Sequence, residues 1–123
     1  MTHRYRPALA TVATLAIASP FAHAQDATAG KAVFVQCAAC HSVDGSNGVG
    51  PSLQGVVGRK VGTFPGFRFS RAMKAAGTTW DATSLDGYIA DPQKALPGNV
   101  MPFSGIPDAK QRADLVAYLK TLT

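Results

Sequence analysis

Apolar residues recur at helical spacing in three stretches of the chain, and a long stretch without such a pattern separates them. Residues 27–40 are rich in alanine and place Phe34 and Cys37 at helical spacing. Asp26 or Thr28 can serve as the N-cap of this first helix. The pattern therefore predicts that a helix leads directly into the cysteines.

The second helical stretch runs from Asp81, a suitable N-cap, to Asp91, where Pro92 prevents simple continuation. We expect its inward face to carry Leu85, Tyr88 and Ile89.

The third stretch begins at Asp108, with Gln111 as a capping-box partner. It carries an apolar stripe, which we expect to pack on the first helix: Leu115, Tyr118, Leu119 and Leu122.

The long middle stretch, residues 42–66, contains seven glycines and two prolines and no sustained apolar period. It predicts a loop that wraps around something. A short helix over residues 70–76, closed by Gly77, should follow it. Since the sequence shows neither repeats nor alternating strand patterns, the predicted fold class is all-α, with three main helices, short helices and long loops.

The N-terminal residues 1–24 are typical of a cleaved secretory signal peptide. Arg4 and Arg6 precede an apolar run over residues 8–18, and Ala22-His23-Ala24 provides a small-residue cleavage pattern. The alternative, a membrane anchor, is disfavoured because the run is too short to cross a bilayer. We therefore expect export to the periplasm and one mature domain, residues 25–123, without stable membrane insertion.

The predicted mature chain is mildly basic. All seven acidic residues and ten of the twelve basic residues follow residue 24, which leaves a net charge of +3. Such a balance suits an acidic partner surface or simple solubility. Without a basic motif it does not indicate nucleic-acid binding.

The chemistry-bearing motif is Cys37-Ala38-Ala39-Cys40-His41, which matches the c-type haem attachment signature. Two thiols one turn apart can each add to one vinyl group of a porphyrin, while the adjacent imidazole reaches the iron. A redox dithiol would need a βαβ context, and a zinc site would need a fourth ligand. Haem c, attached through two thioethers, is the predicted cofactor.

The second axial ligand of the iron follows largely from counting. His41 is the only histidine after residue 24, so a thioether is the usual remaining strong ligand, from Met73 or Met101. Met73 lies within a predicted short helix, where core filling is the commoner role of methionine. Met101 is favoured because Pro97 and Pro102 flank it and predict an extended loop.

The chain resembles the class I cytochromes c, close to the soluble carriers of bacteria and mitochondria, over nearly all of residues 28–123. The matching positions include Gly30, Phe34, Gly50-Pro51, Gly58-Arg59-Lys60, Pro65-Gly66-Phe67, Trp80, Tyr88, Asp91-Pro92, Met101, Phe103, Gly105 and the 115–119 segment. The resemblance implies the class I cytochrome c fold around one haem, with His41 and Met101 as iron ligands.

The resemblance also implies further cofactor-binding residues. The Pro51 carbonyl would accept a hydrogen bond from the far nitrogen of His41, and Tyr88 would approach the Met101 sulfur. Arg59 and Trp80 would bind the haem propionates. Phe103 would be a further residue of the cofactor-binding site.

Three positions depart from the family pattern. The sequence has Phe69 where the family commonly has a propionate-binding Tyr, Met73 where it often has Asn, and Val100 where Lys often precedes the ligand. These departures predict a drier haem pocket with a shifted reduction potential.

The expected function is outer-sphere transfer of one electron by a monomeric shuttle without enzyme activity. By resemblance, its partners are a quinol:cytochrome c reductase, a terminal oxidase or a periplasmic dehydrogenase. The alternative is a haem protein that senses or reacts with gas or peroxide because its methionine ligand is labile. A dithiol oxidoreductase without haem is a third class.

Overall fold

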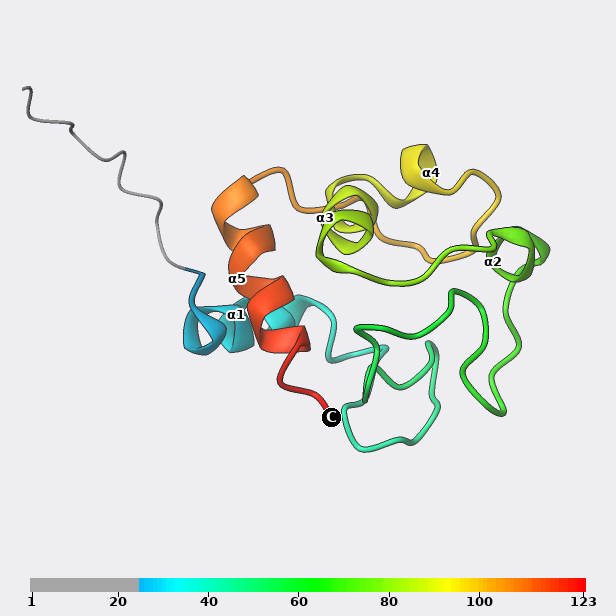
Figure 1. The fold of residues 1–123 in the computed structure, drawn as a ribbon, viewed down its shortest axis with the longest axis horizontal. Helices are drawn as coiled ribbons and strands as arrows, with labels where there is room; N and C mark the ends of the chain where they lie inside the picture. Colours follow the sequence, from blue (N-terminus) through cyan, green and yellow to red (C-terminus); the bar gives the residue numbers. More distant parts are fainter. Residues whose placement is uncertain (1–24) are drawn as a thin grey trace, which may run out of the picture.

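The computed structural model describes residues 25–123, and the predicted signal peptide lies outside the described residues. In the described part of the chain, long loops join five α-helices and one 3-10 helix (Figure 1): α1 (Ala27–Val33), η1 (Phe34–Gln36), α2 (Arg71–Ala75), α3 (Ala82–Ala90), α4 (Pro92–Ala95) and α5 (Ala109–Leu119). Within residues 25–123 the only strand-like pairing is a single bridge between Lys60 and Thr79. The all-α prediction is confirmed.

The first helix is shorter than the predicted 27–40. α1 begins after Asp26, whose carboxylate accepts hydrogen bonds from two N–H groups of the first turn. From Phe34 onward the winding tightens, because the N–H of Cys37 donates to the Phe34 carbonyl at 2.8 Å, three residues back. The N–H of Cys40 likewise donates to the Cys37 carbonyl at 3.1 Å, so the cysteine motif occupies a turn rather than a regular helix.

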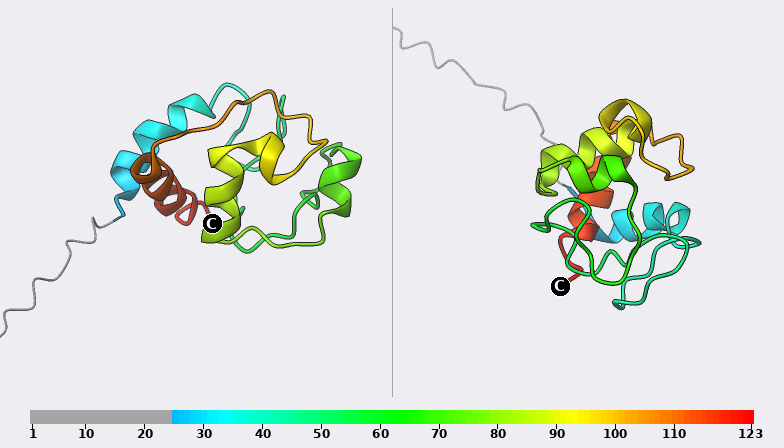
Figure 2. Two further views of the ribbon diagram at one scale, coloured as in Figure 1. Left: turned by 90° about the horizontal axis from the view of Figure 1, so that it is seen from above. Right: turned by 90° about the vertical axis from the view of Figure 1, so that its right-hand side faces the viewer.

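α1 and α5 lie against each other, although the sequence separates them by more than seventy residues (Figures 1 and 2). Gly30 is buried at their contact, where an added Cβ would lie 1.9 Å from the Asp114 carbonyl oxygen and 2.9 Å from Tyr118 Cβ. Only glycine permits this backbone approach. The predicted packing of the last helix on the first is confirmed.

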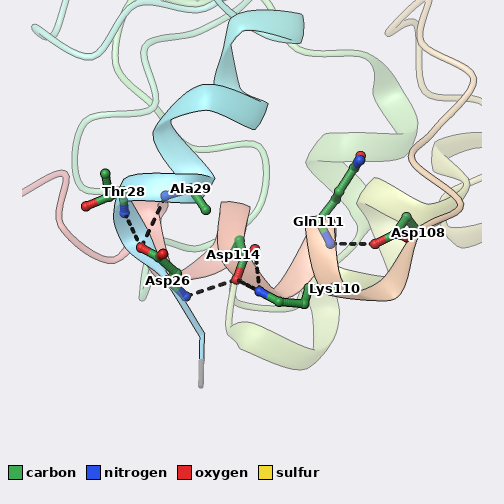
Figure 3. Close-up of polar contacts among 7 residues, drawn as sticks. All are labelled: Asp26, Thr28, Ala29, Asp108, Lys110, Gln111 and Asp114. Carbon is green, nitrogen blue, oxygen red and sulfur yellow. Dashed lines mark hydrogen bonds and ion pairs between the residues drawn. The ribbon is translucent and has the colours of Figure 1, made fainter. Parts of the chain in front are cut away.

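A buried carboxylate also joins these two helices (Figure 3). Asp114 Oδ1 accepts a hydrogen bond from the Asp26 N–H at 2.9 Å, and Lys110 Nζ lies 2.8 Å from Asp114 Oδ2. The bond from Lys110 and, next, that from Asp26 lower the pKa of Asp114. Asp114 therefore stays ionised as the pH falls below the usual range of a carboxyl group.

The N-cap of α5 forms only in part as predicted. Asp108 accepts a hydrogen bond from the Gln111 N–H at 2.8 Å (Figure 3), but no return bond from the Gln111 side chain occurs in the described structure. A complete capping box instead begins α3, where Asp81 and Ser84 bond reciprocally.

α3 carries its predicted inward face, since Leu85, Tyr88 and Ile89 are all buried. Pro92 does end this helix, but the chain then winds into α4, which the sequence reading did not anticipate. Asp91 closes α3 and also N-caps α4 by accepting from the Lys94 N–H at 3.1 Å. Pro92 occupies the first position of α4, where its missing N–H costs nothing.

One hydrophobic cluster connects η1, α3, α5 and two loop positions: Phe34, Val56, Leu85, Ile89, Ile106, Leu115, Val116 and Leu119. Beyond α4 the chain returns along α3, where the Ile106 N–H donates to the Ile89 carbonyl at 2.9 Å.

No helix within residues 25–123 is long and apolar enough to span a membrane.

The Gly30 contact gives a test of the α1–α5 packing. We expect Gly30→Ala to destabilise the folded protein by about 3 kcal/mol, because the new methyl group meets backbone that cannot move aside. Chemical unfolding of the purified protein measures this loss.

Gly87→Ala in α3 is the matched control, since nothing lies within 4 Å of its added Cβ. It should stabilise the protein by about 0.5–1 kcal/mol, because alanine favours helix over glycine. Equal effects of the two substitutions would contradict the packing described.

Candidate haem site

A cavity of about 450 Å³ lies between α3, α5 and the loops, and its wall is mostly apolar. Its volume falls in the range typical of ligand pockets, roughly 300–1,000 Å³. All nine residues predicted to bind cofactor line it: Cys37, Cys40, His41, Pro51, Arg59, Trp80, Tyr88, Met101 and Phe103. The fold therefore brings the predicted site residues together from segments far apart in sequence.

The two thiols of the motif are free and half-buried where the turn meets the cavity. Burial, and secondarily the neighbouring Cys40, raises the pKa of the Cys37 thiol. Cys37 is therefore protonated at neutral pH. It does not have the lowered thiol pKa that marks a reactive redox dithiol.

The imidazole of His41 is fixed by the loop that follows it. His41 Nδ1 lies 2.7 Å from the Pro51 carbonyl oxygen, which can only accept, so Nδ1 carries the proton. In the neutral imidazole, the other ring nitrogen, Nε2, then has a free lone pair. The predicted contact between Pro51 and His41 is thus present.

Gly50 allows this loop to lie flat against the imidazole. An added Cβ at Gly50 would lie 2.5 Å from His41 Cε1, and the Gly50 N–H donates to the Cys40 carbonyl at 2.8 Å. From the sequence, only the family resemblance singles out Gly50. The physical requirement for glycine here is visible only once the ring and the loop are placed together.

Met101 faces the same cavity from the proline-flanked loop, and Tyr88 on α3 reaches it. The Tyr88 hydroxyl lies 3.9 Å from Met101 Sδ, within the range of a weak hydrogen bond to sulfur. Burial raises the pKa of Tyr88 to about 12, so the hydroxyl keeps its proton and donates. Met73 also lines the cavity, and the structure therefore leaves two thioethers within reach of it.

Trp80 and Arg59 form part of the cavity wall at another point. The Trp80 ring packs against Tyr88 with centroids 5.0 Å apart. Arg59 donates from Nη1 to the Ser52 carbonyl at 3.1 Å and from Nη2 to the Gln54 carbonyl, and its guanidinium lies 4.3 Å above the Phe64 ring. Arg59 therefore braces the middle loop, and propionate binding by Arg59 and Trp80 stays a prediction.

The donor set fits a covalently attached haem better than a bare metal ion. Residues 25–123 contain no cluster of three or more His, Cys, Asp or Glu side chains able to hold a metal. They do provide two thiols, an imidazole nitrogen and a thioether around one apolar cavity. This combination suits a flat apolar macrocycle whose iron needs one nitrogen and one sulfur ligand.

Asn99 and Val49 are site residues that the sequence reading missed. Asn99 is buried beside Met101, and its side chain bonds to the Met101 N–H. The available signal was an amide in an otherwise apolar, proline-flanked loop. Val49 lines the cavity while remaining 73% exposed, which a glycine-rich loop sequence cannot indicate.

Comparison with known proteins identifies the family. The family model described as "Cytochrome c" matches residues 27–123. The chain belongs to the cytochrome c family. Within it, Cys37, Cys40 and His41 form the motif that attaches haem c covalently.

This cytochrome is 52% identical over 90 residues to cytochrome c2 iso-2 of Magnetospirillum fulvum, covering 72% of this chain and 94% of the relative. It is 51% identical over 98 residues to cytochrome c2 iso-2 of Magnetospirillum molischianum, covering 79% and 98%. Cytochrome cH from Methylobacterium extorquens superposes with a TM-score of 0.76 at 50% identity, covering 78% of this chain and 98% of that one. The chain is therefore a cytochrome c2-like electron carrier and not an enzyme.

Two of the three departures from the family pattern give a testable prediction. Phe69, which packs edge-on against Phe67 at 4.9 Å, and Met73 both line the cavity. We expect Phe69→Tyr and Met73→Asn each to shift the reduction potential by about 20–65 mV, the equivalent of one added hydrogen bond. Redox titration of the haem-loaded variants measures the shift.

Phe64→Tyr is the control, because it adds the same hydroxyl group to a ring that does not line the cavity. Its potential should match that of the unmodified protein. Unchanged potentials in both cavity variants would remove the expectation of a drier pocket.

Proposed function

We propose that this chain is an exported, periplasmic one-electron carrier that holds haem c through Cys37 and Cys40, with His41 and Met101 as axial ligands. One observation carries the proposal: both thiols, the imidazole and the Met101 thioether open onto a single apolar cavity. Residues 1–24 act as the cleaved signal peptide, which accords with two free thiols that must meet haem in the exporting compartment.

Each residue at the site has a separable task. Cys37 and Cys40 would tether the cofactor, and the Pro51 carbonyl orients the His41 ring through Nδ1, which leaves Nε2 as the nitrogen that would bind iron. Tyr88 donates toward the Met101 sulfur and steadies it. The bound haem supplies an iron couple that exchanges one electron without bond making. Because the chain would supply two iron ligands, His41 and Met101, the bound haem would keep no open position for gas or peroxide.

The mouth of the cavity is uncharged. The exposed residues that line it are Gln36, Val49, Val100 and Pro102, and each of the two valines is 73% exposed. The exposed basic residues of the middle of the chain, Lys60, Arg68, Arg71 and Lys74, do not line the cavity. We therefore infer that partners dock through a small apolar contact with a modest electrostatic component, as suits a transient redox encounter.

The partner classes that fit are a quinol:cytochrome c reductase or a periplasmic dehydrogenase as donor and a terminal oxidase as acceptor. All three exchange single electrons with carriers of this kind. We infer that the carrier acts as a monomer, because within residues 25–123 only four large apolar residues are exposed: Val35, Val43, Val49 and Val100.

Carbon monoxide binding tests the ligand assignment. Reduced wild-type protein should not bind carbon monoxide at neutral pH, whereas reduced Met101→Ala should bind it readily because one axial position is open. The absorption spectrum of reduced, haem-loaded protein reports the binding directly.

Met73→Ala is the matched control, since it removes the other thioether of the cavity and should leave binding absent. Binding by the wild type would favour the alternative, a gas- or peroxide-reactive protein with a labile methionine. Binding by Met73→Ala alone would transfer the ligand role to Met73.

Salt dependence tests the uncharged mouth. Oxidation of the reduced protein by ferricyanide, a small anion, should slow by less than about tenfold as salt rises to physiological strength. Val100→Lys should steepen this dependence, whereas Gln111→Lys, on the exposed part of α5 away from the cavity, should change it less. A steep fall for the wild type would contradict the proposed docking surface.

A further inference from the structure

The side-chain amide of Asn99 lies buried between α4 and the loop that carries Met101, with only 6% of the residue exposed. Its Nδ2 donates to the Pro92 carbonyl at 2.8 Å and to the Leu96 carbonyl at 2.9 Å. Its Oδ1 accepts from the Met101 N–H at 2.9 Å. The amide therefore links both ends of α4 to the backbone of Met101.

This link works in one orientation only. Both Nδ2 hydrogens point at carbonyl groups, and Oδ1 meets the Met101 N–H and, at 3.3 Å, the Gln93 side-chain amide. Exchanging oxygen and nitrogen would set acceptor against acceptor and donor against donor. A residue that only filled space at this position would not need such a directional set of bonds.

The link is anchored at a buried residue, although α4 is a single short turn. Pro92 is among the most fully buried residues of the described chain, and its carbonyl also accepts the Leu96 N–H at 3.0 Å. Gln93 closes the same turn from outside by donating to the Asn99 carbonyl at 3.0 Å. Movement of Met101 away from the cavity would therefore break bonds to a fixed, buried element.

We propose that Asn99 is a positioning residue for the axial methionine: its amide fixes the Met101 backbone to α4 and so keeps the thioether on the iron. The inference rests on the proposed function, because it assumes that Met101 ligates haem. Tyr88 contacts the sulfur, whereas Asn99 holds the backbone, so the two contacts restrain different parts of one residue. A ligand held at both points dissociates less often than one held by the metal bond alone.

The test measures how readily imidazole displaces the methionine from the ferric protein. We expect Asn99→Ala to raise imidazole affinity about tenfold, since it removes the bond to the Met101 N–H and leaves two buried carbonyls without that partner. The weak red absorption band of a ferric haem with a thioether ligand should fade in parallel. Gln93 is exposed, and Gln93→Ala should raise the imidazole affinity by a smaller factor. This variant keeps the inference testable if Asn99→Ala does not bind haem.

Asp108→Ala is the matched control for stability. It removes the N-cap of α5, which touches neither Met101 nor α4, and should lower the melting temperature without changing imidazole affinity. If Asn99→Ala and Gln93→Ala lower the melting temperature and leave both the affinity and the red band at wild-type values, the residue is merely structural and the inference is overturned. Met101→Ala distinguishes a failure of this inference from a failure of the proposed function. If Met101→Ala bound imidazole with wild-type affinity, Met101 would not be the iron ligand.

Discussion

The fold depends on one backbone-to-backbone contact, the crossing of α1 and α5 at Gly30. Because the Asp114 carbonyl occupies the space of a side chain at Gly30, the two helices approach more closely than any other residue would allow. α1 continues through η1 into the cysteine turn, and α5 supplies Leu115 and Leu119 to the cavity wall. The crossing thus fixes the covalent attachment point relative to one wall of the site. The buried Asp114 carboxylate adds a directional bond to the same contact.

The middle loop, residues 42–66, is held by side chains that bond to its backbone rather than by regular secondary structure. The hydroxyl of buried Ser52 accepts from the Gly45 and Gln54 N–H groups, and Arg59 donates to two carbonyls of the same loop. Within residues 25–123 no buried side-chain nitrogen or oxygen lacks a hydrogen-bond partner. Loops without regular secondary structure can therefore surround an apolar cavity, because their buried polar groups are hydrogen-bonded.

Sequence reasoning succeeded where the information is local. The spacing of Cys37, Cys40 and His41 defines an attachment motif without reference to any other part of the chain. The apolar face of α3 likewise follows from periodicity alone. In α5, periodicity predicts the buried Leu115 and Leu119 but not the buried Val116, and the predicted Leu122 lies beyond the end of the helix. The first helix was predicted too long because its alanine-rich sequence does not reveal that the winding tightens at Phe34.

The contacts that sequence reasoning missed are non-local or depend on exact geometry. Pro92 reads as a helix terminator, and nothing in the local pattern shows that Asp91 caps a new turn behind it. The role of Asn99 depends on carbonyl groups three and seven residues away, which meet its amide only after α4 has formed. The choice between Met73 and Met101 rested on the flanking prolines and the family resemblance, and the cavity contains both side chains.

Asp91 ends α3 and begins α4, so the two helices share a single residue as their pivot. α3 carries Tyr88, whose hydroxyl contacts the Met101 sulfur. α4 carries the Pro92 carbonyl, which binds the Asn99 amide that holds the Met101 backbone. A change in the angle between α3 and α4 at Asp91 would therefore alter both contacts with Met101 together. A partner that displaced α4 would therefore displace Met101 as well, because the Asn99 side chain bonds both to α4 and to the Met101 N–H.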